Sequence, residues 1–115
     1  MGKGETIMVF VEVGRSGDIA PGAMKAVVAE GRQVLVVNVD NSYYAIARKC
    51  PHLGGDLSKG VLEGKVVTCP RHGSRFDVTT GAAVRGPKIG PLRLNVKDVT
   101  TYAVRVEGDS IQVSV

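Results

Sequence analysis

The stretch CPRHGS at residues 69–74 has a near-repeat upstream in CPHLGG at residues 50–55. These two short stretches hold both cysteines and both histidines of the 115-residue chain. Each stretch offers one thiol and one imidazole, which are side chains that bind transition metals well. Glycine and proline surround them, so the backbone can closely approach a bulky bound group. The pattern Cys-x-His, then sixteen residues, then Cys-x-x-His predicts one site shared by two loops.

Three other interpretations of these four residues compete with a shared cofactor site. A disulfide between Cys50 and Cys69 would leave both histidines unexplained, and a cytosolic context disfavours it. Four unrelated structural residues would have no reason to occur as two matched pairs. A tetrahedral zinc site is the serious rival, because two cysteines and two histidines are common zinc ligands. Zinc loops usually separate their ligands by about two to four residues, so the tight Cys-x-His spacing disfavours zinc but leaves it open.

Outside the two loops, the sequence alternates mostly with a period of two. Leu92, Leu94 and Val96 alternate with polar residues, which predicts a strand with one apolar face. The runs at 102–106 and 111–115 alternate in the same way around the turn residues GDS, so they predict a C-terminal hairpin.

A second hairpin is predicted by QVLVVNVD and YYAIARKC, which are joined by the turn residues NS at 41–42. The run VLVV is apolar on both faces, which is typical of a central strand. Further strands are expected at VFVEV and KVVTC, and the second of these delivers Cys69 to its loop. The spacing in AMKAVVAE also allows a helical turn, but the β-branched Val27 and Val28 between flanking glycines favour a strand.

Many short strands and 15 glycines predict an all-β protein, a small antiparallel sandwich or barrel. The length suits a single domain over residues 1–115. Aromatic residues make up only 4% of the chain, so the core must be mostly aliphatic. The segment at about 48–82 is irregular by comparison, and we expect a loop-built subdomain there, carried by the β scaffold.

The charge and hydropathy of the chain exclude several classes of function. The net charge is +4, but the charges are scattered and no basic stripe is interleaved with aromatic residues, so nucleic-acid binding is disfavoured. No apolar run approaches the roughly 18–20 residues that span a membrane. The N-terminal apolar run is interrupted by Glu12 and does not resemble a signal peptide. We expect a soluble, cytoplasmic monomer without a membrane anchor.

The two loops resemble the Rieske iron–sulfur family, whose two boxes read Cys-x-His-x-Gly and Cys-x-x-His-Gly. The similarity extends to FDVTTG after the second box and to the proline-bearing loop GPKIGPL further on. The resemblance implies one 2Fe–2S cluster per chain, with Cys50 and Cys69 on one iron and His52 and His72 on the other. Two neutral imidazoles in place of two thiolates make the centre less negative, so its reduction potential is higher than that of an all-cysteine cluster.

The resemblance also separates two branches of the family. Members that oxidise quinols carry a membrane anchor and an additional cysteine in each box, which form a disulfide across the cluster loops. The corresponding positions here are Gly55 and Arg71. The chain is therefore similar to a soluble Rieske ferredoxin with a barrel-like Rieske fold.

Further residues are implied around the cluster. Ser74 stands where high-potential members use a serine hydroxyl that donates to a cluster sulfur, although a plain turn residue is the alternative. Phe76 stands where those members have a tyrosine, and core packing is its simpler role. Leu53 is expected to shield the cluster, while Pro91 or Pro87 would cover it from the other side.

The function that this resemblance implies is one-electron transfer, not catalysis. We expect electrons to pass from a flavin-dependent reductase to a terminal oxygenase or similar acceptor. The alternatives are a Rieske-type small subunit of a larger oxidoreductase, such as an NADH-dependent nitrite reductase, and a zinc-binding module. A visible spectrum with EPR of the reduced protein would separate zinc from a cluster.

Overall fold

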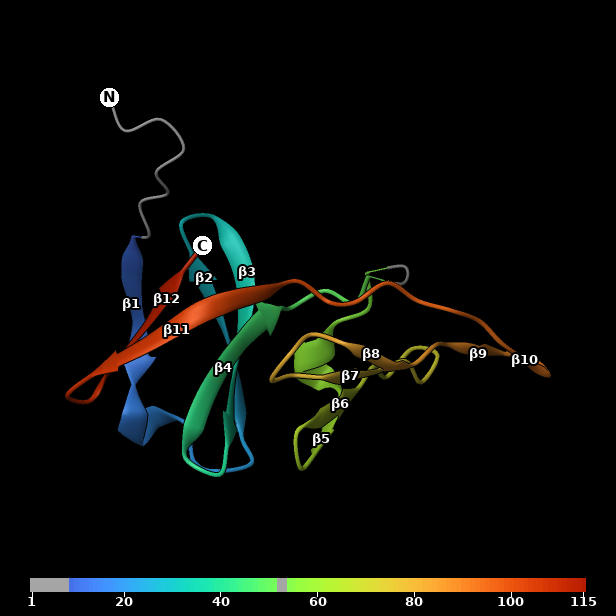
Figure 1. Ribbon diagram of the computed structural model, residues 1–115, viewed down its shortest axis with the longest axis horizontal. Coiled ribbons are helices and arrows are strands. Elements are labelled where there is room, and N and C mark those ends of the chain that lie inside the picture. The colour runs from blue at the N-terminus through green and yellow to red at the C-terminus, as the bar shows by residue number, and fades with distance from the viewer. Residues whose placement is uncertain (1–8, 52–53) are drawn as a thin grey trace.

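The computed structural model describes residues 9–51 and 54–115 (Figure 1). In this part of the chain, the regular structure consists of strands and two short 3-10 turns, η1 (Ser16–Asp18) and η2 (Leu57–Lys59). No helix in it is long and apolar enough to cross a membrane. The strands are β1 (Phe10–Arg15), β2 (Met24–Ala29), β3 (Arg32–Val39), β4 (Ser42–Ala47), β5 (Val61–Glu63), β6 (Val66–Thr68), β7 (Arg75–Asp77), β8 (Ala83–Arg85), β9 (Lys88–Ile89), β10 (Leu92–Arg93), β11 (Thr101–Glu107) and β12 (Ser110–Ser114).

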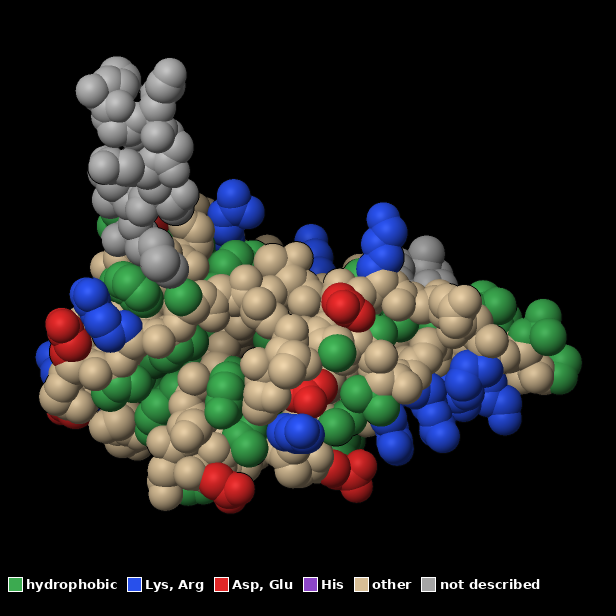
Figure 2. Space-filling view, viewed as in Figure 1, with side chains coloured by type: hydrophobic (Ala, Val, Ile, Leu, Met, Phe, Trp, Pro, Cys, Tyr) green, Lys and Arg blue, Asp and Glu red, His purple; other side chains and the backbone are tan. Residues whose placement is uncertain are grey.

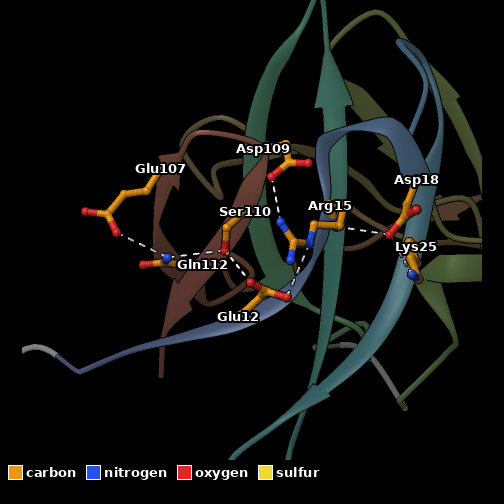
Figure 3. A network of polar contacts seen from close by, with 8 residues as sticks. All are labelled: Glu12, Arg15, Asp18, Lys25, Glu107, Asp109, Ser110 and Gln112. Atoms are coloured by element: carbon orange, nitrogen blue, oxygen red, sulfur yellow. Dashed lines mark hydrogen bonds and ion pairs between the residues drawn. The ribbon is translucent and has the colours of Figure 1, made fainter.

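Six strands form the larger sheet, in the order β1-β12-β11-β4-β3-β2, with antiparallel neighbours throughout. Its two outer strands pack against the same barrel cluster, through Val13 on β1 and Val27 on β2. Asp18, at the end of η1, also pairs with Lys25 on β2 at 3.8 Å. Arg15 at the end of β1 pairs with Asp109 in the β11–β12 turn at 2.6 Å (Figure 3). The sheet therefore curls into a nearly closed barrel, and the prediction of an all-β, antiparallel, barrel-like fold is confirmed.

Two-residue turns set the register of the barrel hairpins. Glu30 and Gly31 join β2 to β3, and Asp40 and Asn41 join β3 to β4; all four have positive φ angles between 50° and 77°. Two consecutive positive angles are typical of the type I′ hairpin turn. The predicted hairpin at 33–50 is confirmed, but its turn lies one residue earlier than expected and Ser42 already belongs to β4.

The segment AMKAVVAE is a strand as predicted, β2, and the C-terminal hairpin is also present as β11 and β12. The strand predicted for the alternating run of Leu92, Leu94 and Val96 is wrong. Only Leu92–Arg93 is a strand, and it pairs with β9 of the proline loop. Leu92 and Leu94 are exposed. Val96 is partly buried against the inter-sheet cluster, so the alternating run is split between an exposed ribbon and the core and does not form one strand with a single covered face.

A second sheet of four short antiparallel strands has the order β5-β6-β7-β8; its first three strands lie within the segment that was expected to be irregular, and β8 directly follows it. Of these strands only β6 was predicted. The other three have three residues each, too few to show a clear alternation. The loop that begins at Cys69, between β6 and β7, is therefore carried by a small sheet of its own (Figure 1).

β3 separates two apolar clusters, which is why it is buried on both faces. Val34 and Val36 point into the barrel cluster with Ile111 and Val113. Leu35 and Val37 alternate with them and belong to the cluster between the two sheets. The remaining members of this inter-sheet cluster are Ile46, Cys50, Leu57, Val67, Cys69, Phe76, Val78 and Val99.

Candidate metal centre

Two loops that leave the two sheets present the predicted ligands. The first begins at Cys50, shortly after β4 of the barrel, and the second begins at Cys69, directly after β6 of the small sheet. Both cysteines are buried, with exposed fractions of 2% and 3%, and both belong to the inter-sheet cluster. Packing against Leu57 and Val67 fixes the backbone from which each thiol projects.

The backbone of the first loop closes on itself through two hydrogen bonds. The Cys50 N–H donates to the Gly55 carbonyl at 2.7 Å, and the Gly54 N–H donates to the Cys50 carbonyl at 3.1 Å. Gly54 has a φ of +67°, a conformation that favours glycine.

The second loop repeats the same two bonds. The Cys69 N–H donates to the Ser74 carbonyl at 2.7 Å, and the Gly73 N–H donates to the Cys69 carbonyl at 3.2 Å. Gly73 has a φ of +79°. The near-repeat in the sequence is thus a repeat in backbone structure, and each turn presents its cysteine in the same way.

Gly55 shows how closely the two loops approach each other. A Cβ atom built on Gly55 would lie 2.7 Å from the Cys69 Sγ, closer than real Cβ contacts allow. It would also lie 3.6 Å from the Arg71 Cβ, within the Cβ–Cβ separation of about 3.5–4.5 Å that a disulfide requires. The two positions that carry extra cysteines in the quinol-oxidising branch are therefore neighbours here, as the resemblance implies.

Ser74 provides a test of whether these residues fit a bound group. It is 1% exposed, and its Oγ has no hydrogen-bond partner among the residues that the structure describes. A buried hydroxyl normally has a partner, because losing its water without one is costly. Its location in the second cysteine loop fits a hydrogen bond to an acceptor atom of a cluster bound there.

The proline loop is attached directly to the second cysteine loop. The Lys88 N–H donates to the His72 carbonyl at 2.8 Å. Pro87, next to Lys88, is buried, whereas Pro91 is exposed. Phe76 is fully buried in the inter-sheet cluster.

The two predicted residues that remain, His52 and Leu53, lie outside the described residues. The structure therefore places one predicted histidine, and it brings both predicted cysteines to adjoining loops.

An ion pair that sequence reasoning missed holds the first loop. The Arg48 Nε and Nη2 donate to the two Asp56 carboxylate oxygens at 3.1 and 2.9 Å. The Ser58 N–H and Oγ donate to the Asp56 Oδ1 at 3.0 and 2.6 Å. These donors, Arg48 first, hold the pKa of Asp56 well below its ordinary value, and the same pair raises the pKa of Arg48. The only sequence signal was Asp-x-Ser, a common helix-capping pattern.

Asp56 and Arg48 clamp the two ends of the first loop. The backbones of Lys49 and Asp56 form an isolated antiparallel β-bridge, and the Leu57 N–H donates to the Arg48 carbonyl at 2.9 Å. Residues on either side of 50–55 are thereby held together by side-chain and backbone bonds. The entry and exit of the loop that carries Cys50 are fixed without a disulfide.

Comparisons with known proteins agree with this geometry. The model of the Rieske [2Fe-2S] domain matches residues 9–106. The ferredoxin component of biphenyl 2,3-dioxygenase from Rhodococcus jostii (strain RHA1) is 37% identical over 106 residues, which cover 92% of each chain. In structure, the chain resembles the ferredoxin of carbazole 1,9a-dioxygenase from Nocardioides aromaticivorans IC177, with a TM-score of 0.76, 34% identity and coverage of 91% and 96%.

A third comparison concerns the fold alone. A putative NADH-dependent nitrite reductase small subunit from Mycobacterium tuberculosis superimposes with a TM-score of 0.79 at 24% identity, covering 96% of this chain and 97% of that one. The family match spans both cysteine loops, and relatives above 30% identity extend over most of the chain. The chain belongs to the Rieske [2Fe-2S] domain family.

Proposed function

We propose that this chain is the ferredoxin of an oxygenase system, taking single electrons from a flavin-dependent reductase and delivering them to a terminal oxygenase. The observation that carries this function is the pair of Rieske loops on a chain that matches a dioxygenase ferredoxin component over 92% of both lengths. When bound, the [2Fe-2S] cluster supplies the chemistry, the uptake and release of one electron. The protein is a carrier and not an enzyme.

The ligand set remains a proposal at the level of individual residues. We propose that Cys50 and Cys69 hold one iron and that His52 and His72 hold the other. The burial of both cysteines and the repeated backbone turns support the thiolate pair. His72 lies in the second loop, which closely approaches the first loop at Gly55, and this position supports His72 as an imidazole ligand.

The residues around the ligands have proposed roles as well. Ser74 would donate to the cluster, and Gly55 would leave room for it beside the Cys69 sulfur. Pro87 is better placed than Pro91 to cover the cluster, because Pro87 is buried and its neighbour Lys88 is bonded to the second loop. The fully buried Phe76 would act through core packing.

Three further points belong to the same proposal. The chain would work as one domain over residues 1–115, because the inter-sheet cluster joins both sheets into one packed unit. It would work in the cytoplasm, where flavin-dependent reductases have access to reduced nicotinamide. It would work as a monomer, since a mobile carrier must expose its cluster end to two partners in turn.

The test is spectroscopic and does not need a partner. Purified protein should contain two irons per chain, absorb in the visible range and give a rhombic EPR signal after reduction. His72→Ala should lose that signal, because one iron would keep a single protein ligand. Stoichiometric zinc with no visible absorption would overturn the proposed function in favour of a zinc-binding module.

A further inference from the structure

The proline loop and its two flanking strands form a projecting arm with an apolar surface. We use the term basic arm for residues 83–94, which contain β8, β9 and β10; Figure 1 shows β9 and β10 projecting from the end of the molecule opposite β1. Four large apolar residues of the arm are exposed: Val84 at 58%, Ile89 at 44%, Leu92 at 63% and Leu94 at 42%. The exposed large apolar residues elsewhere in the described chain are dispersed: Val9 precedes β1, and the others lie singly on β2, β5 and β11. The grouping in the arm therefore marks a candidate contact surface.

Charge is distributed unevenly between this end and the rest of the protein. Residues 64–97 contain seven basic and one acidic residue, a net charge of +6, whereas the rest of the chain contains eight basic and ten acidic residues, a net charge of −2. The acidic residue, Asp77, pairs with Lys65 at 3.3 Å. Figure 2 shows Lys and Arg side chains gathered along one side of the projecting end, beside the apolar tip. The overall charge of +4 therefore conceals a strongly positive end.

The arm is also built onto the proposed electron-transfer site. The Lys88 N–H is bonded to the His72 carbonyl at 2.8 Å. Within the arm, the Leu94 N–H donates to the Pro87 carbonyl at 2.9 Å, and the Arg93 Nη1 donates to the Gly86 carbonyl at 2.8 Å. A partner that contacts the arm would thus lie next to a proposed ligand loop.

We propose that the basic arm is the docking surface for the redox partner, and that the partner's docking face has an apolar centre bordered by carboxylates. This inference rests on the proposed function and adds the chemistry of the partner to it. Ile89, Leu92 and Leu94 supply the apolar contact, while Arg85 and Lys88 supply charge that attracts an acidic surface. Complementary charge of this kind chiefly accelerates encounter, and salt weakens it.

A protein partner fits the arm better than a nucleic acid or a membrane. Single-stranded nucleic acid is bound by stacking on aromatic side chains, and the arm contains none. Binding to a membrane surface typically uses an amphipathic helix with Trp, Phe or Leu on one face, and the arm is a short β ribbon.

The experiment measures electron transfer from the reduced holoprotein to two acceptor proteins by stopped flow, at ionic strengths from low to high. The acceptors are cytochrome b5, which is acidic, and cytochrome c, which is basic. Arg85→Gln/Lys88→Gln removes two exposed charges from the arm, and within the described chain neither side chain forms an ion pair. Lys25→Gln/Arg32→Gln removes two exposed charges from the β2–β3 hairpin of the barrel and is the control with the same net charge; it also removes the exposed Lys25–Asp18 ion pair at 3.8 Å, so its thermal stability is measured alongside.

If the basic arm is the docking surface, the wild-type rate with cytochrome b5 should fall as the ionic strength rises. The wild-type rate with cytochrome c should not fall. At low salt, the arm variant should slow transfer to cytochrome b5 by several-fold to about tenfold, while the control variant should stay within twofold of wild type. Equal effects of the two variants would overturn the proposal, because net charge and not the arm would then govern encounter.

A second pair of variants tests the apolar part. Leu92→Ser should slow transfer to cytochrome b5 several-fold, while leaving the reaction with the small anion ferricyanide unchanged. Val28→Ser, at an exposed position on β2, is the control and should change neither rate. An unchanged rate with cytochrome b5 would overturn the apolar contact.

Three more outcomes separate this inference from other occupants and from the proposed function. Sedimentation with phosphatidylglycerol vesicles, or a mobility shift of duplex DNA, that the arm variant abolishes would overturn a protein partner. Absence of the cluster spectrum would refute the proposed function itself. An intact cluster spectrum with salt-independent rates would refute only the docking surface.

Discussion

At the scale of single residues, Ser74 is the side chain best placed to tune the cluster without binding it. Its buried hydroxyl has no partner in the described chain, and a hydrogen bond to a cluster atom would strengthen as the cluster gains negative charge. A difference of about 1–2 kcal/mol between the two redox states corresponds to roughly 40–90 mV for one electron. Ser74→Ala should therefore lower the reduction potential by that amount in protein-film voltammetry. Ser42→Ala, at the exposed start of β4, is the control, and an unchanged potential in Ser74→Ala would leave Ser74 as a turn residue only.

Gly55 is required for a different reason, since any side chain there would collide with the Cys69 Sγ at 2.7 Å. Gly55→Ala should displace that sulfur and reduce the iron content to well below two atoms per chain, as measured by iron analysis and visible absorption. Gly17→Ala is the matched control, because a Cβ at Gly17 meets nothing within 4 Å. Full iron occupancy in Gly55→Ala would show that the loop can move aside without loss of the cluster.

At the scale of elements, the clamp between Arg48 and Asp56 predicts how the first loop responds to acid. The clamp depresses the pKa of Asp56, so the folded state binds this proton more weakly than the unfolded chain does. Its stabilisation is complete above the ordinary value of 3.8 and is lost as the pH falls below it.

Thermal melts of the holoprotein followed by circular dichroism test the clamp. At neutral pH, Asp56→Asn should lower the Tm by a few degrees, and the difference from wild type should narrow as the pH falls from about 5 to about 3. Arg48→Gln should have a similar effect, and the double variant should be less destabilised than the two single variants added together. Additive effects would mean that the two residues stabilise the loop independently.

The elements also show which patterns the sequence could reveal. The long strands of the barrel were predictable because β3 and its neighbours are bordered by turn residues and buried by a second layer. The alternation from Leu92 to Val96 was misleading, because Leu92 and Leu94 are exposed on the arm and only Val96 packs against the core. Strands of three residues, such as β7 and β8, depend on pairing with β6, and only the folded chain supplies it.

The candidate ligand residues were more predictable from the sequence than the ion pair that holds their loop in place. Cysteine and histidine are rare in this chain, so their paired occurrence stood out, and glycine at 54 and 73 indicated the two turns. The Arg48–Asp56 clamp escaped notice because charged residues are common on any surface. Only the structure shows that these two bracket a ligand loop.

At the scale of the whole molecule, the two apolar clusters divide stability between the scaffold and the site. The barrel cluster, which includes Val36, Ile111 and Val113, contains none of the three proposed ligands that the structure describes. The inter-sheet cluster includes both Cys50 and Cys69, so its packing depends on how the two loops are held. Loss of the [2Fe-2S] cluster should therefore loosen the small sheet and leave the barrel folded.

Native-state hydrogen exchange on His72→Ala, and on wild-type protein from which iron has been removed, would test this division. The far-UV circular dichroism of both samples should retain the strand signal. The amides of Val36, Ile111 and Val113, on the central strands β3 and β12, should keep slow exchange close to that of the holoprotein, because their apolar cluster is intact. The amides of Val67 and Phe76, on β6 and β7, should lose protection by about tenfold or more, because local opening then costs less than global unfolding. Uniform loss of protection in both samples would show that the [2Fe-2S] cluster organises the whole fold. Protection retained at Val67 and Phe76 would show that the small sheet is stable without the [2Fe-2S] cluster.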